Sequence, residues 1–176
     1  RHGELDLVMG RLPAPEKMQG LIFQPLFRDR VVFAVHATHP LASGTQFAID
    51  ALEKFPVIVP NDNSIIRPFV DRLFVEQGIP EPSRAIESVS DSFGRAFVRR
   101  HQAVWIISRG VIAPEIERGE FAVLPIDTAS TMGSVGLMTR AQSSETAASG
   151  HFAEIRLNGG TVALRGVLSL LAGGKL

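Results

Sequence analysis

Two clusters of small polar residues are the features of this sequence most able to bind a ligand. Asn63 and Ser64 follow one apolar segment that resembles a buried β-strand, and Ser90 and Ser92 follow another. Each cluster precedes a run with helical periodicity, so both are predicted helix N-termini with free backbone N–H groups. The positive end of the helix dipole makes such places favourable for anions. The alternative is that these residues only cap their helices.

Two arginines accompany these clusters. Arg11 ends a nearly continuous apolar strand that begins at Leu5, and Arg67 falls in the first turn after Ser64. A guanidinium group matches a carboxylate with two parallel hydrogen bonds. Together with the serine clusters, the arginines favour a site for a carboxylate, although Arg67 is equally well read as a solvated surface residue.

Catalytic and metal-binding patterns are missing from the sequence. It contains no G-x-S-x-G elbow, no P-loop and no G-x-G-x-x-G turn, and it has no cysteine for a nucleophile, a disulfide or a thiolate zinc site. The five histidines are scattered, and we interpret His36 and His39, which precede Pro40, as structural or solvated. We therefore predict that the chain is not an enzyme and has no cofactor or metal.

The order of strands and helices predicts the fold class. Residues 33–125 alternate apolar strands with helical segments, including helices over 66–77 and from Ser90 onward. Such an order is typical of an α/β fold with a mostly parallel sheet and helices on both faces. The flanking segments predict a second lobe, with chain crossings near residues 30–35 and 125–130. For the tail, residues 162–172 fit either a small apolar helix or a paired strand.

Composition limits the partners of this chain. Eighteen basic residues balance eighteen acidic ones among 176, so there is no overall charge bias toward nucleic acid or anionic lipid. No apolar stretch of roughly 18 residues occurs, and so no transmembrane helix is expected.

Several segments resemble the effector-binding domains of LysR-type transcriptional regulators. Gly3 to Arg11, G-E-L-D-L-V-M-G-R, resembles a strand of that family, and residues 32–41 are similar to its crossover strand, which ends in H-P-L. Residues 103–111 occupy the place of a further family strand but lack its usual glycines. Residues 10–18, 64–68 and 87–97 look like the branch of the family that regulates protocatechuate catabolism.

The resemblance implies a periplasmic-binding-protein-like α/β fold of two Rossmann-like lobes with a ligand cleft between them. Residues 1–32 and 127–176 are then an incomplete lobe I, and residues 33–126 are lobe II. It also implies a cytoplasmic homo-oligomer, a dimer or a tetramer, which contacts promoter DNA through a domain upstream of this sequence and has no membrane partner. A solute-binding protein of a transporter, with the same fold, is the alternative.

The resemblance further implies a small carboxylate effector of the protocatechuate or carboxymuconate type. Capping residues and arginines would hold the carboxylates, and apolar residues would contact the carbon skeleton. The implied ligand-binding residues are Arg11, Asn63, Ser64, Ile65, Arg67, Ser90, Ser92, Phe93 and Ile107.

Overall fold

A computed structural model of the chain describes residues 7–43, 49–140, 152–157 and 160–165. The chain divides into two compact units, unit 1 with residues 1–27 and 134–176 and unit 2 with residues 28–133. The predicted start at Leu5 of the strand that ends at Arg11 lies outside the described residues. The predicted lobe boundaries stay a prediction.

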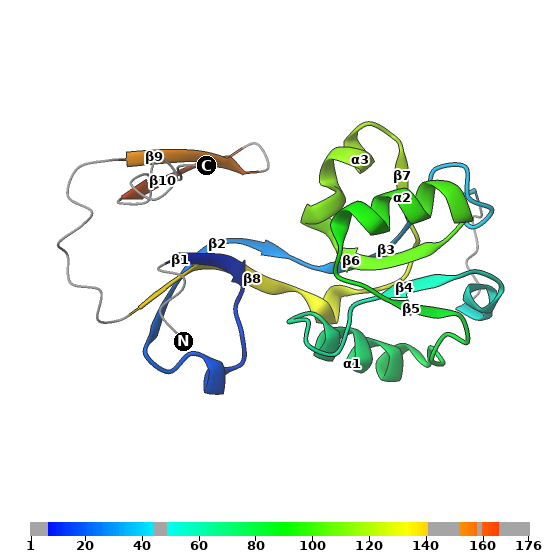
Figure 1. Cartoon of the computed structure of the whole chain (residues 1–176), viewed down its shortest axis with the longest axis horizontal. Helices are drawn as coiled ribbons and strands as arrows, with labels where there is room; N and C mark the ends of the chain where they lie inside the picture. Colours follow the sequence, from blue (N-terminus) through cyan, green and yellow to red (C-terminus); the bar gives the residue numbers. More distant parts are fainter. Residues whose placement is uncertain (1–6, 44–48, 141–151, 158–159, 166–176) are drawn as a thin grey trace, which may run out of the picture. The chain divides into compact units, whose positions relative to one another are not determined.

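Unit 2 contains a five-stranded sheet in the order β5-β4-β6-β3-β7 (Figure 1). Strand β4 runs parallel to both β5 and β6, whereas β3 is antiparallel to β6 and β7. The sheet is therefore mixed, because β3 enters unit 2 directly from β2 and not through a helical crossover. The strands are β3 (Val31–His36), β4 (Val57–Val59), β5 (Ala85–Glu87), β6 (Val104–Ser108) and β7 (Phe121–Val123).

Helices cover both faces of this sheet, α1 on one side and α2 with α3 on the other (Figure 1). The predicted helix after residue 66 is confirmed as α1, and it ends at Gly78, whose φ of 63° is the left-handed conformation that suits glycine. The helices are α1 (Arg67–Gln77), α2 (Asp91–His101) and α3 (Ala113–Glu117), with the 3₁₀ helices η2 (Ile49–Lys54), η3 (Arg109–Ile112) and η4 (Ala129–Thr131).

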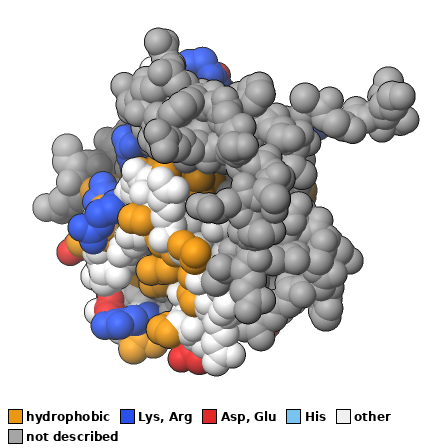
Figure 2. Space-filling view, turned by 90° about the vertical axis from the view of Figure 1, so that its left-hand side faces the viewer, with side chains coloured by type: hydrophobic (Ala, Val, Ile, Leu, Met, Phe, Trp, Pro, Cys, Tyr) orange, Lys and Arg blue, Asp and Glu red, His pale blue; other side chains and the backbone are white. Residues whose placement is uncertain are grey.

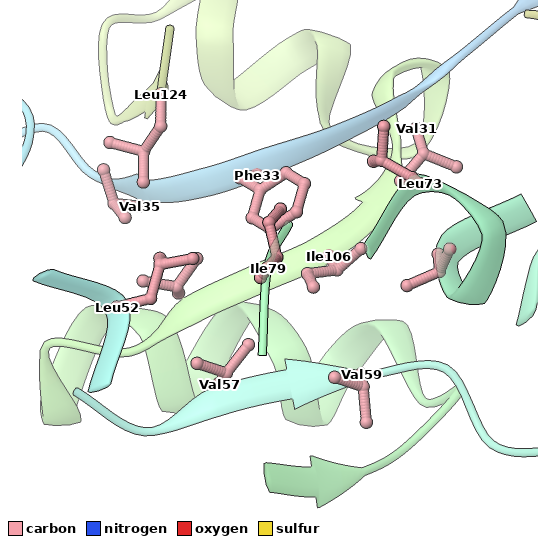
Figure 3. Packing of buried hydrophobic residues seen from close by; sticks show 12 residues of the cluster. Val31, Phe33, Val35, Leu52, Val57, Val59, Leu73, Ile79, Ile106 and Leu124 are labelled. Atoms are coloured by element: carbon pink, nitrogen blue, oxygen red, sulfur yellow. The ribbon is translucent and has the colours of Figure 1, made fainter. Parts of the chain in front are cut away.

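Strand β3 supplies both cores of unit 2 because its side chains alternate between the two faces. Val31, Phe33 and Val35 pack toward α1 (Figure 3), and Val32 and Ala34 pack toward α2 and Trp105. Full burial of one such aliphatic or phenyl side chain stabilises the fold by about 1.5–3 kcal/mol. The prediction that Trp105 is a core residue is confirmed, since it is 1% exposed.

The segments at the boundary of unit 2 are tied to one another by a side chain. The Thr131 hydroxyl accepts a hydrogen bond from the Val31 N–H at 2.9 Å and donates one to the Thr128 carbonyl at 2.7 Å. Thr131 is 1% exposed, so these bonds are shielded from water. The start of β3 and the end of η4 are therefore held together, although 100 residues separate them in sequence.

Unit 1 contains a three-stranded sheet in the order β1-β8-β2 and a separate antiparallel hairpin of β9 and β10. Apolar side chains remain exposed on this unit: Val8, Met9, Leu12 and Ile22 are between 40% and 54% exposed, and Figure 2 shows apolar side chains at the surface. Of the two alternatives for the tail, the structure has the strand as far as Arg165. The elements are β1 (Leu7–Arg11), η1 (Pro15–Lys17), β2 (Leu21–Asp29), β8 (Gly133–Arg140), β9 (Phe152–Leu157) and β10 (Gly160–Arg165).

Candidate functional site

The segment that follows β4 forms turns before α1 begins. The Ser64 N–H donates to the Asn61 carbonyl at 2.9 Å, and the Arg67 N–H donates to the Ser64 carbonyl at 3.2 Å. The Ser64 hydroxyl accepts from the Ile66 N–H at 3.4 Å, and the N-cap of α1 is Ile66, without a side-chain cap. The prediction that Ser64 caps α1 is therefore wrong in position, because two further residues complete a turn before the helix starts.

The segment that follows β5 agrees with the sequence. Ser90 is the N-cap of α2, and its hydroxyl accepts from the Phe93 N–H at 3.3 Å. The Ser92 hydroxyl lies 3.1 Å from the Ser90 hydroxyl, and the Ser90 N–H donates to the Ser88 hydroxyl at 3.1 Å. The predicted cap is confirmed, and two hydroxyl groups stand together at the positive end of α2.

These two segments lie at the same edge of the sheet. Strands β4 and β5 are parallel neighbours, with Val59 opposite Glu87, and the Ser88 N–H donates to the Val59 carbonyl at 3.0 Å. Ile107 is the penultimate residue of β6, the other parallel neighbour of β4, and is partly buried. The carboxyl edge of the parallel strands, where open α/β sheets bind their ligands, thus carries all the predicted site residues of unit 2.

Apolar side chains are exposed among these polar groups. Ile65 is 38% exposed and Phe93 37%, and Val89, between β5 and α2, is 57% exposed. β5 ends at Glu87, and so Val89 belongs to the loop between β5 and α2. Its position two residues beyond a strand end and next to a serine cap was the available signal. The edge combines hydroxyl groups with an apolar surface.

Arg67 is surrounded by acceptors. Its Nε donates to Asp71 at 2.7 Å, and its Nη1 lies 3.1 Å from Asp62 and 3.4 Å from Glu87. Nη1 also donates to the Pro60 carbonyl at 3.0 Å. The pKa of Arg67 is raised, chiefly by the hydrogen bond to Asp71. Arg67 also lines a groove of about 290 Å³ between α1 and β5.

Arg95, within α2, anchors this helix to η3 and α3. Arg95 Nε donates to Glu115 Oε1 at 2.9 Å, and Nη2 donates to the Val111 carbonyl at 2.5 Å. Burial raises the pKa of the Glu115 carboxyl, but its hydrogen bonds to Arg95 and to its own backbone N–H, together with the charges of Arg95 and Arg118, outweigh burial, so that the pKa is lowered overall. The ion pair thus joins α2, which carries Ser92 and Phe93, to α3.

Arg11, the predicted cation of lobe I, belongs to unit 1. It is the last residue of β1, opposite Val135 of β8, and is 6% exposed. The structure describes it within that sheet, so a role beside the residues of unit 2 stays a prediction.

Of the two roles that the sequence leaves open for His39, structural or solvated, the structure shows the structural one. It is 2% exposed, its Nδ1 accepts from the Leu41 N–H at 3.0 Å, and its Nε2 lies 3.0 Å from the Gln102 carbonyl. Since Nδ1 accepts and Nε2 must donate, the ring is neutral with its proton on Nε2. Burial lowers the pKa of His39. The H-P-L turn is therefore fixed to the end of α2, where Gln102 has a φ of 46°.

The described residues contain neither a metal-binding cluster nor a membrane-spanning helix. Among them, no group of three or more histidine, aspartate or glutamate side chains could hold a metal ion. None of the helices in that part of the chain is long and apolar enough to cross a membrane.

Comparison with known proteins identifies the family. The family model of the LysR substrate binding domain matches residues 1–158. The HTH-type transcriptional regulator PcaQ of Agrobacterium fabrum is 47% identical over 141 residues, which cover 80% of this chain and 45% of PcaQ. The uncharacterized HTH-type transcriptional regulator YdcI of Escherichia coli is 30% identical over 78% of this chain and 45% of its own length. The chain thus spans less than half the length of these relatives.

Solved structures show the same fold. The regulatory domain of Synechocystis CcmR in complex with 2-PG superposes with a TM-score of 0.64 at 23% identity, covering 80% of this chain and 66% of that one. The effector-binding domain of QuiR in complex with shikimate gives 0.61 at 21% identity, covering 80% and 65%. The relatives are named as regulators, which does not favour the transporter alternative, and the LysR substrate-binding domain is regulatory and not enzymatic. The chain therefore belongs to the LysR substrate-binding family and has its periplasmic-binding-protein-like α/β fold.

Proposed function

We propose that this chain is the effector-sensing part of a LysR-type transcriptional regulator and that its effector is a carboxylate of aromatic catabolism, of the protocatechuate or carboxymuconate type. The observation that carries the proposal is the Ser90 cap of α2, which stands beside the Ser64 turn at the carboxyl edge of the sheet. The 47% identity to a regulator named PcaQ supports the aromatic-acid class.

The edge has the groups that such a ligand needs. In this proposal the hydroxyl groups of Ser90, Ser92 and Ser64 donate to the effector's carboxylate, and the dipole of α2 favours its charge. Exposed Ile65 and Phe93 cover the carbon skeleton. The remaining predicted contacts, all part of this proposal, are Asn63 and Ile107 from unit 2 and Arg11 from unit 1, and Arg67 lies beside the Ser64 turn.

Regulation follows from differential binding. An effector shifts an equilibrium between lobe arrangements only by the difference in its affinity for them. In this proposal the two units are the lobes, and the shift is passed to promoter DNA through the DNA-binding part of a cytoplasmic dimer or tetramer. The two segments that join the units, near Arg28 and Gly133, are where such a rearrangement would bend the chain.

Isothermal titration calorimetry tests this proposal with protocatechuate and carboxymuconate as ligands. Removing one hydroxyl that donates to a charged group costs about 1.5–3 kcal/mol, so Ser64→Ala and Ser90→Ala should each weaken binding roughly 10- to 100-fold. Ser83→Ala is the matched control, because the Ser83 hydroxyl donates to Glu53 away from the edge. The proposal fails if neither acid binds, or if both serine variants bind as tightly as the control.

A further inference from the structure

Arg67 connects four parts of unit 2 that meet at the carboxyl edge. Its guanidinium contacts Pro60 at the end of β4, Asp62 in the following turn, Asp71 in α1 and Glu87 at the end of β5. Its own N–H also donates to the carbonyl of Ser64. A single side chain thus links the turn that presents Ser64 to the strand that leads to Ser90.

The charge of Arg67 is already matched in this arrangement. Three carboxylates lie within 3.4 Å of one guanidinium, so the cluster carries an excess of negative charge. The carboxylates are more than half exposed, at 81% for Asp62, 56% for Asp71 and 53% for Glu87, whereas the Arg67 side chain is 19% exposed. An effector carboxylate that approached Arg67 would meet these carboxylates first and be repelled.

Resting on the proposed function, we propose that Arg67 is a positioning residue of the effector site, which fixes the Ser64 turn against the end of β5 and leaves the effector's charge to the serine hydroxyls and the α2 N-terminus. A planar guanidinium with donors in a fixed fork can span four acceptors in different directions, which the point charge of an ammonium cannot. Loss of the fork frees the Ser64 turn, and every effector that uses Ser64 loses affinity.

The rival role is direct contact. Nη2 is not used by any of the four acceptors, and a contact of Nη2 with the effector would make Arg67 sensitive to the effector's charge. The two roles differ in what happens when the charge is removed from the ligand. They differ also in whether the affinity for a neutral ligand falls when Asp71, the nearest partner of Arg67, is neutralised.

The test compares protocatechuate with its neutral amide, 3,4-dihydroxybenzamide, by calorimetry on the full chain. If Arg67 positions the turn, Arg67→Met weakens both ligands by the same factor, about tenfold, and Arg67→Lys does likewise. Asp71→Asn then weakens the neutral amide, which the carboxylate charges do not repel, because Arg67 loses its closest anchor. Arg72→Met is the matched control on the same helix, since Arg72 is 77% exposed and pairs with Glu76.

A contrary pattern overturns the assignment. Direct contact predicts that Arg67→Met weakens the acid at least tenfold more than the amide, that Arg67→Lys retains most of the acid's affinity, and that Asp71→Asn leaves the affinity for the amide unchanged. The Asp71→Asn variant decides the matter even where Arg67→Met fails to fold, because Asp71 is exposed. If the wild-type chain binds neither ligand, the proposed function itself is wrong. If the wild-type chain binds both ligands and Asp71→Asn leaves the affinity for the amide unchanged, only the positioning role of Arg67 is wrong.

Discussion

Gly94 of α2 lies directly against the ring of Trp105, and Gly94→Ala should destabilise the protein although alanine is the better helix former. A Cβ atom at Gly94 would lie 2.5 Å from Trp105 Cε2 and 2.7 Å from Trp105 Cη2, both shorter than real Cβ contacts. Trp105 is 1% exposed and packed between Val98, Ile58 and their neighbours, so its ring has no room to retreat. The helix must therefore move.

Two opposing effects set the magnitude. In an unhindered helix interior, replacing glycine with alanine stabilises by about 1 kcal/mol. Overpacking a dense core by a methyl group costs typically about 1–3 kcal/mol, and contacts this short belong at the upper end. The expected net effect is a loss of about 2 kcal/mol in the free energy of unfolding.

Urea denaturation followed by far-UV circular dichroism measures this loss, with the fluorescence of Trp105, the only tryptophan, as a second probe. Ala96→Gly is the control on the exposed side of the same helix, and it should cost about 1 kcal/mol through propensity alone. In a Trp105→Phe background the second ring is absent, and Gly94→Ala should become neutral or stabilising. A gain in stability from Gly94→Ala in the wild-type background would refute the close approach of α2 to Trp105.

Three further predictions concern buried polar groups. Thr131→Val should lower the free energy of unfolding by about 1–3 kcal/mol because the Val31 N–H loses its acceptor, whereas Thr131→Ser should cost much less. Equal effects of the two variants in urea denaturation would contradict the role of this hydrogen bond. Because burial lowers the pKa of His39, the unfolded chain binds more protons than the folded chain below pH 6.5, the ordinary pKa of histidine. The contribution of His39 to stability should therefore be constant above pH 6.5 and fall below it, and His39→Gln should remove that fall in thermal melts. Glu115→Gln should lower the free energy of unfolding by about 1.5–3 kcal/mol at neutral pH because Arg95 loses a charged partner. Since the pKa of the Glu115 carboxyl lies below 4.5 in the folded state, this loss should shrink as the pH falls below 4.5. A loss of stability that is independent of pH would contradict the ion pair.

The local elements of unit 2 were predictable because their signals are short in range. The N-cap at Ser90, the end of α1 at Gly78 and the core position of Trp105 follow from neighbouring residues or from apolar patterning. The prediction for Ser64 failed within the same range, because a turn and a helix start use the same residue types. Only the backbone geometry separates a hydroxyl that bonds the Ile66 N–H in a turn from one that caps α1.

The direction of β3 relative to its neighbouring strands could not be predicted from the sequence. Apolar strands in series with helices predict parallel pairing, but β3 follows another strand and lies antiparallel to β6 and β7. An apolar strand buried on both faces carries no mark of the direction of its neighbours. The same limit applies to Val89, whose assignment to the loop depends on where pairing with β4 ends.

By itself, the sequence determined the α/β class, the family and the candidate residues at the strand ends, because each rests on types and spacings along the chain. Only the tertiary structure decided which of those residues share one edge, that Arg67 meets three carboxylates, and that Glu115 pairs with Arg95 twenty residues away. Charges interact through space, and separations of a few ångströms set their energies. The number of residues between two charges does not determine their separation in space, which is set only when the sheet brings its strand ends together.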